Sequence, residues 1–230
     1  SKHGAITLEP IAPDNFPAPL IAGSNSFFAK KEYGSILLQE YSTELFSIRY
    51  SIFNFSKKIS LLFNNEKNGL RSLLALQNST KIRFEKNKTL SLLQDQYVLV
   101  NGGSTETITF NKTGEYKLFD TIFSQNLLKQ LGSSFPALQQ FFTGKAVPPG
   151  KLQIKAHRFA PHQLLGHAAD ILKSPYDESF RKFYFENKIR DFLFDLMVDA
   201  AEEKPDTKVS HTESASLQKA KHIILSDISK

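Results

Sequence analysis

The sequence predicts an α+β protein in which an N-terminal antiparallel β-barrel or sandwich is followed by a helical subdomain. Two changes of pattern support this. Through residues 34–124, short runs alternate apolar and polar side chains, and turn-forming residues separate them. Beyond residue 124, apolar residues recur every three or four positions, the spacing of a helix that packs on a core. We therefore expect four parts: an irregular proline-rich arm (1–33), the barrel (34–124), the helical subdomain (125–203), and a linker with one more helix (204–230).

The arm is predicted to be irregular because prolines crowd its middle. Pro10, Pro13, Pro17 and Pro19 fall within ten residues of one another. Each proline fixes φ and lacks a backbone N–H, so neither a helix nor a central strand accommodates this spacing. Both a mobile regulatory arm and a plain lead-in to the barrel are compatible with this composition.

The barrel is predicted from about eight short strands, of which residues 45–55 (LFSIRYSIFNF) alternate most clearly. Phe46, Ile48, Tyr50 and Ile52 would share one face of that strand. The segments NNEKNG, QNST, NGG and NKTGE are typical turns. The other expected strands are residues 34–43, 59–63, 70–77, 81–85, 96–101, 105–110 and 115–123.

The helical part is predicted at residues 124–132, 135–144, 160–174, about 176–203 and 217–230. The fourth of these helices is apolar on more than one side. One face would lie against the barrel, and another would form a homodimer contact. Phe180, Tyr184 and Phe192 are the candidate dimerisation residues. The last helix has an apolar stripe that needs a partner, either the body of the protein or a further domain.

Composition restricts the class of protein. The 230 residues contain no cysteine, which excludes disulfides and thiolate chemistry and is compatible with the cytoplasm. No apolar run is long enough to span a membrane, and the first residues do not form an export signal. The net charge of +6 is uneven, since residues 56–88 carry eight basic and two acidic side chains. That segment would either bind an anionic partner or keep a solvated sheet surface soluble.

The search for catalytic and metal-binding patterns finds none. Of the six histidines, His157, His162 and His167 lie five residues apart, so a helix would not place them on one face. No histidine occurs within 34–124, which argues against a metal site in the barrel. Phosphate-binding loops and nucleophile elbows are also absent from the sequence. We expect no metal, no cofactor and no enzymatic activity.

A ligand site inside the barrel is predicted around Arg49. Arg49 shares one face of its strand with three residues, Ser47, Ser51 and Phe53. If this face points inward, hydroxyls, one ring and one guanidinium would suit a small anionic or polyol ligand. If it points outward, Arg49 is simply solvated. Arg71 and Arg83 are weaker candidates of the same kind, and Asp120 is expected to be buried and paired.

The helical half resembles the sensing region of AraC-type transcription regulators. The residues that carry the resemblance are GEYKLFDTIFSQNLLKQLGSSFPALQQFF (114–142) and ILKSPYDESFRKFYFENKIRDFLFDLM (171–197). In this family a strand leads into a helix and a Phe-Pro pair, here Phe135-Pro136, and then into a long helix. Pro175-Tyr176, Glu186 and Lys188 fit the pattern of that long helix.

The resemblance implies a cupin-like barrel that senses a small-molecule effector and a helical region that forms a homodimer. LQKAKHIIL (217–225) is similar to the helix that opens the family's helix-turn-helix domain, with residues 204–214 as the linker. Because the recognition helices are absent from this sequence, DNA would be bound only through a domain that this chain lacks. The effector would shift the population of two arrangements of arm, barrel and helices.

Two alternatives stay open. One is a stand-alone cupin-like enzyme or sugar-binding barrel, which would need a metal or a cluster of catalytic residues. The other is an adaptor protein whose basic strand region binds an acidic partner.

Overall fold

A computed structural model describes residues 6–10, 21–65, 69–84, 88–101, 104–134, 153–174 and 176–201. The chain divides into two compact units, Ser1–Ala200 and Ala201–Lys230. All described elements lie in the first unit, except for the last residue of the long helix. The predicted helices 135–144 and 217–230, the linker 204–214 and the central part of the arm lie outside the described residues.

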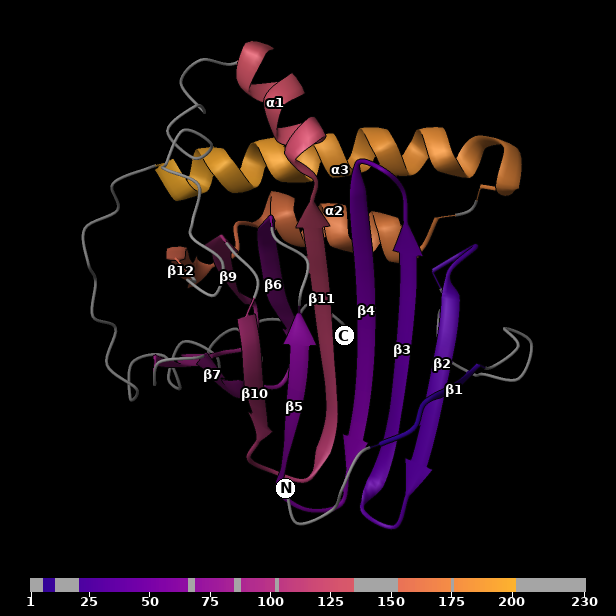
Figure 1. The fold of residues 1–230 in the computed structure, drawn as a ribbon, viewed down its shortest axis with the longest axis vertical. Helices are drawn as coiled ribbons and strands as arrows, with labels where there is room; N and C mark the ends of the chain where they lie inside the picture. Colours follow the sequence, from indigo (N-terminus) through magenta and orange to yellow (C-terminus); the bar gives the residue numbers. More distant parts are fainter. Residues whose placement is uncertain are drawn as a thin grey trace, which may run out of the picture. The chain divides into compact units, whose positions relative to one another are not determined.

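Two antiparallel sheets form the β-structure (Figure 1). The larger sheet has the strand order β1-β2-β3-β4-β11-β6-β9-β12, and the smaller has the order β5-β10-β7-β8. The strands of the larger sheet are β1 (Glu9–Pro10), β2 (Asn25–Lys31), β3 (Gly34–Ser42), β4 (Phe46–Phe55), β6 (Leu70–Gln77), β9 (Gln96–Asn101), β11 (Gly114–Phe123) and β12 (Gln153–Phe159). Those of the smaller sheet are β5 (Ile59–Asn65), β7 (Thr80–Phe84), β8 (Thr89–Leu92) and β10 (Ser104–Phe110).

A cluster of aromatic rings packs in the space between the two sheets, together with aliphatic side chains. Phe53 on β4 and Phe110 on β10 have ring centroids 4.6 Å apart, and Phe110 also meets Phe55 and Tyr116 at 5.0 and 4.9 Å. All four side chains are buried. Tilted and edge-to-face contacts of this kind add to the stabilisation that burial alone provides.

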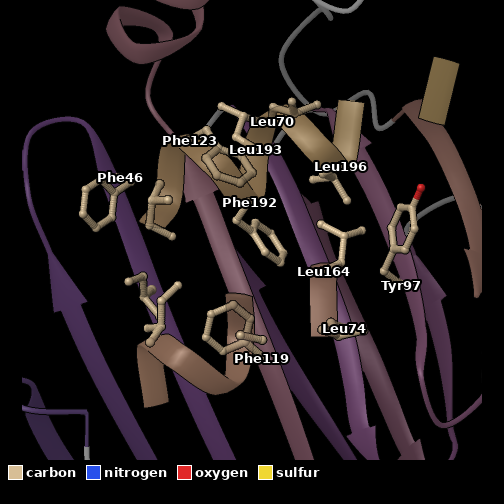
Figure 2. Close-up of a cluster of buried hydrophobic side chains, with 14 of the residues drawn as sticks. Phe46, Leu70, Leu74, Tyr97, Phe119, Phe123, Leu164, Phe192, Leu193 and Leu196 are labelled. Carbon is tan, nitrogen blue, oxygen red and sulfur yellow. The ribbon is translucent and has the colours of Figure 1, made fainter. Parts of the chain in front are cut away.

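Three helices complete the described fold: α1 (Gln125–Ser134), α2 (His162–Leu172) and α3 (Glu178–Ala201). Helices α2 and α3 lie against the face of the larger sheet that points away from the smaller sheet (Figure 1). Figure 2 shows Phe192 of α3 beside Phe119 and Phe123 of β11, with ring centroids 5.8 and 6.5 Å apart. Fully burying one such ring stabilises the fold by roughly 1.5–3 kcal/mol.

The larger sheet is thus packed on both faces, and its alternation divides the side chains between two cores. On β4, Phe46, Ile48, Tyr50 and Ile52 join the core under the helices, whereas Phe53 and Phe55 join the core between the sheets. The antiparallel sheets followed by helices confirm the predicted α+β class. None of the described helices combines the length and the apolarity that crossing a bilayer requires.

Three strands of the larger sheet come from regions in which the sequence predicts none. β1 and β2 belong to the range expected to be an irregular arm, and β12 to the range expected to be helical. β2 pairs with β3 of the barrel and β1 pairs with β2, whereas β12 pairs with β9. The β12 segment (QIKAHRF) lacks strong alternation because it lies at the sheet edge and only Ala156 is fully buried.

Candidate functional site: a charged row inside the barrel

Charged side chains from five strands meet on the inner face of the larger sheet. Arg49 of β4 stands directly between Glu40 of β3 and Asp120 of β11 in the strand register. Arg71 of β6 reaches the same Asp120, and Glu106 reaches Arg71 from β10 of the opposite sheet. We call these five residues the charged row.

Arg71 is the centre of the charged row. Its Nε and one terminal nitrogen donate to the two carboxylate oxygens of Asp120, both at 2.7 Å, and its other terminal nitrogen donates to Glu106 at 2.9 Å. The side chains of Arg71, Asp120 and Glu106 are 8%, 5% and 1% exposed. A planar guanidinium matches a carboxylate with two parallel hydrogen bonds, so this geometry fixes the positions of β6, β10 and β11 relative to one another.

Burial shapes the ionisation of this cluster. Desolvation raises the pKa of Glu106, and the positive charge of Arg71 opposes that rise only in part. Burial lowers the pKa of Arg71, but the carboxylates of Asp120 and Glu106 raise it by more than burial lowers it. Arg71 therefore stays charged. The cluster is therefore a permanently charged guanidinium held by two carboxyl groups. Glu106 is protonated more easily than an exposed glutamate is.

The other end of the charged row opens toward solvent. Arg49 contacts Glu40 at 3.3 Å and Asp120 at 3.9 Å, with 24% of its own side chain and 27% of that of Glu40 exposed. Ser42 and Ser47 both donate to Oε1 of Glu40, at 2.9 and 3.1 Å, and their hydroxyl oxygens are 2.8 Å apart. Glu40, Arg49, Ser42 and Ser47 thus form a polar rim, in which Glu40 and Arg49 are partly exposed and Ser47 is buried.

The four residues predicted as a ligand site divide between the rim and the core. Arg49 and Ser47 are brought together through Glu40. Ser51 is buried deeper along β4, and Phe53 belongs to the aromatic core between the sheets. The expected burial and pairing of Asp120 are confirmed. Arg83, a weaker candidate, points out into solvent from β7.

Sequence reasoning did not single out Glu40 and Glu106. The alternation of β10 could have indicated Glu106, since it shares its parity with the buried Ile108 and Phe110. A lone carboxylate at an inward position requires a cationic partner. That partner, Arg71, is 35 residues away and on the other sheet, which the sequence does not show.

The chemistry that this arrangement offers is binding by hydrogen bonds. Each described carboxylate of the row accepts hydrogen bonds from a guanidinium, and Glu40 also accepts them from hydroxyls. Among the described residues, no group of three or more His, Cys, Asp or Glu side chains is arranged to hold a metal ion. The rim offers donors from Arg49 and acceptors from Glu40, with the hydroxyls of Ser42 and Ser47 able to do either.

The residues predicted for dimerisation lie in three different surroundings. Phe180 is 64% exposed, and Tyr184 is half-buried with its ring 4.7 Å from that of Tyr176. Phe192 is buried between α3 and the larger sheet. Because Phe192 is only 1% exposed within its own chain, a dimer contact on α3 has to use other side chains. Those with exposed apolar surface are Phe180, Phe183, Phe194 and Val198.

No protein-family model matches the chain, and no curated protein sequence matches it. Solved structures with a similar fold include two AraC-like regulators. The transcriptional activator CuxR aligns over 80% of this chain and 64% of its own, with 6% identity and a TM-score of 0.48. ToxT from Vibrio cholerae O395, solved with (E)-4-(8-methylnaphthalen-1-yl)but-3-enoic acid, aligns over 61% of this chain and 54% of its own, with 13% identity and a TM-score of 0.42. This chain therefore spans less than two thirds of either regulator.

Cupin domains are also among the similar structures. One is the cupin domain of an XRE-family transcriptional regulator from Enterobacter cloacae, which aligns over 39% of this chain and 96% of its own, with 11% identity and a TM-score of 0.34. Another is the Cnp3 cupin domain of Schizosaccharomyces pombe, at 42% and 71% coverage, 15% identity and a TM-score of 0.34. These similarities concern the fold of the barrel.

Proposed function

We propose that this chain is the ligand-sensing and dimerisation region of an AraC-type transcription regulator and that it has no catalytic activity. The polar rim of the barrel carries the proposal. It is partly exposed, it combines donors and acceptors, and it continues inward into the buried ion pairs of Arg71 with Asp120 and Glu106. The resemblance of residues 114–142 and 171–197 to the sensing region of that family supports the same conclusion.

The effector that best fits the rim is a small polyol. Arg49 already faces Glu40 and Asp120, so an anionic ligand would have to compete with two carboxylates for one guanidinium. A polyol needs no charge compensation, and its hydroxyls can donate to Glu40 and accept from Arg49 or Ser47 at once. Binding there would change the contacts between β3 and β4.

Thermal unfolding with a panel of monosaccharides and inositol tests this site. We expect at least one polyol to raise the melting temperature of the wild type, because a ligand that binds only the folded state stabilises it. Ser47→Ala should abolish the rise. Ser60→Ala is the matched control, because Ser60 lies on the outer face of β5, where its hydroxyl is 2.9 Å from that of Thr109. An equal rise in both variants would place the ligand elsewhere, and no rise with any polyol would remove the support for polyol sensing.

Dimerisation is proposed through the outer face of α3. Phe180, Phe183, Phe194 and Val198 fall on one stripe of the helix and are at least 37% exposed. The stripe is nearly symmetric about residue 189, so in an antiparallel pair of helices Phe180 of one copy would face Val198 of the other. This is the self-complementarity that a two-fold contact requires.

Sedimentation velocity across a concentration series tests the dimer. We expect the wild type to dimerise and Phe183→Asp to be monomeric, because a charge placed in an apolar contact is costly. Leu62→Asp is the matched control, since Leu62 is equally exposed at 71% but lies on β5 of the smaller sheet. A monomeric wild type, or dissociation by both variants, would contradict a dimer through α3.

DNA recognition is not assigned to the described residues. We propose that a helix-turn-helix domain in the same polypeptide performs it in the cytoplasm, and that ligand binding at the rim changes how two such domains are held. The coding sequence beyond the codon for Lys230 tests this directly. A continued reading frame with two helix-turn-helix patterns is expected, and a stop codon at that point would contradict it.

A second candidate function, an adaptor for an acidic partner, is favoured by the outer face of the smaller sheet. Lys81 and Arg83 extend outward from β7, and the register places the hydroxyls of Thr109 and Thr107 directly beside them. Among the described residues of the four strands, the only carboxylate is Glu106, which points inward to Arg71. Binding of poly-glutamate that weakens with salt and is lost in Lys81→Glu/Arg83→Glu would support this function.

A further inference from the structure

A second polar cluster lies on the opposite side of the larger sheet, where the segment 21–26 meets β3 and the start of α3. Four polar atoms there are buried and have no hydrogen-bond partner: Oγ of Ser24, Oγ of Ser26, Nε2 of Gln39 and Nε of Arg181. A buried polar group without a hydrogen-bond partner is destabilising, so four of them in one region of the fold require an explanation. We propose that these residues bind the carboxylate or phosphate group of a small anionic ligand.

The turn at residues 21–24 has contacts that place the four groups around the start of β2. The N–H of Ile21 donates to Oε1 of Gln39 at 2.7 Å, and the N–H of Ser24 donates to the carbonyl of Ile21 at 3.0 Å, which closes the turn. Ser26 stands opposite Gln39 in the register of β2 and β3. Because Ile21 fixes which amide atom of Gln39 is the oxygen, the NH₂ group of Gln39 must point away from Ile21 with no acceptor to bind.

Arg181 is held against the same turn from α3. A Cβ added to Gly23 would lie only 2.5 Å from a terminal nitrogen of Arg181, so the guanidinium rests directly on the glycine backbone. No described carboxylate forms an ion pair with Arg181. Asp177, one turn earlier, is occupied, because its Oδ1 accepts from the backbone N–H groups of Ser179 and Phe180 at 3.1 and 3.4 Å.

The unpartnered groups determine the ligand class. The amide NH₂ of Gln39 and the guanidinium of Arg181 can only donate, and the two serine hydroxyls can donate as well. A ligand group that satisfies them must accept several hydrogen bonds and carry negative charge, as carboxylates and phosphates do. Gln39 and Tyr41 point to the helix side of β3, whereas Ile36 and Leu38 point into the barrel. The site is therefore separate from the rim and does not depend on the proposed function.

The test uses acetate and inorganic phosphate as probes, each titrated against sodium chloride at equal ionic strength while thermal unfolding is followed. We expect one of the two anions to raise the melting temperature in a saturable way, by about 3 °C or more once its concentration exceeds its Kd tenfold. The anion that acts identifies the ligand group as a carboxylate or a phosphate. Arg181→Gln and, independently, Ser26→Ala should reduce or abolish the rise.

Lys182→Gln is the matched control, because it removes the same charge from the neighbouring exposed position of α3. It should leave the rise unchanged. A rise that persists in Arg181→Gln and Ser26→Ala, or one lost equally in Lys182→Gln, overturns the site. So does the absence of any anion-specific rise, which would mean that only water satisfies these groups. If Arg181→Gln does not fold, Ser26→Ala decides alone.

Discussion

The hydroxyl of Tyr97 donates a 2.6 Å hydrogen bond to the carboxylate of Asp199, and this contact fastens β9 to the last turn of α3. Asp199 is only 4% exposed, although a carboxylate near the C-terminus of a helix is unfavourable. A second contact compensates there, since Arg158 of β12 donates to the carbonyl of Asp199 at 2.6 Å. Two strands thus hold the end of α3 at the point where the chain continues beyond residue 200.

Tyr97→Phe should destabilise the fold by about 1–3 kcal/mol, because it leaves the buried carboxylate of Asp199 with one partner fewer. The phenol is the donor throughout the neutral range, since burial and then the hydrogen bond to Asp199 raise the pKa of Tyr97. Urea denaturation followed by circular dichroism measures the loss. Tyr176→Phe, at a tyrosine that is 46% exposed, is the control and should change stability little. Equal effects of the two variants would show that the bond to Asp199 is unimportant.

Glu106 should make the fold less stable as pH rises. Burial raises the pKa of Glu106 in the folded state above that of the unfolded chain, which is about 4.3. Its contribution to stability is fully present below the unfolded pKa and is lost as pH rises through the higher folded pKa, because the unfolded state ionises first. The loss begins near pH 4 and continues until the pH has passed the raised pKa of the folded state.

Glu106→Gln tests this dependence, because glutamine does not ionise and its carbonyl can still accept from Arg71. The difference in unfolding free energy, wild type minus variant, should fall as pH rises from about 4 to about 8. Urea midpoints at several pH values measure it. Glu115→Gln, at a partly exposed glutamate of β11 that contacts Lys117, is the control for removing a carboxylate outside the charged row. A difference that grows with pH would contradict a raised pKa for Glu106.

Gly23 and Gly166 should respond in opposite directions to replacement by alanine. Gly23 has φ +72° and lies against Arg181, so an added Cβ is strained and displaces the guanidinium. We expect Gly23→Ala to destabilise the fold by about 1 kcal/mol or more. Gly166 lies within α2 and has open space where a Cβ would be, so Gly166→Ala should stabilise by roughly 0.5–1 kcal/mol. Thermal unfolding of the two variants side by side measures both, and a change of the same sign in both would refute the argument.

The sequence predicted those features that depend on local periodicity. The alternation of β4 correctly indicated which side chains share a face, and the apolar spacing of α3 indicated a helix with a buried side. The sequence could not indicate that Arg49 would face Glu40 rather than solvent. Alternation assigns the side chains of a strand to two faces, but it does not show which face is buried. The central position of Arg71 in the charged row depends on pairings 35 and 49 residues apart, which no local pattern encodes.

The buried side of α3 shows the same limit. Phe180, Phe183, Phe185, Phe192 and Phe194 are equally apolar in sequence, yet only Phe185 and Phe192 are buried. The helix carries phenylalanines on two opposite faces, so periodicity alone does not select the face that meets the sheet. The rings of Phe119 and Phe123 on β11 select it, since they contact Phe192.

Phe192→Ala and Phe180→Ala should therefore differ sharply. Phe192→Ala removes a ring packed between Phe119, Phe123 and its neighbours on α3, and leaves a cavity that should cost about 3–5 kcal/mol. Phe180→Ala should change the stability of the monomer by no more than about 0.5 kcal/mol, because 64% of its surface is already exposed. Urea denaturation at low protein concentration measures both while keeping dimerisation out of the comparison. If Phe180→Ala is instead as costly as Phe192→Ala under these conditions, the outer stripe of α3 is packed within its own chain and is not free to contact a second copy.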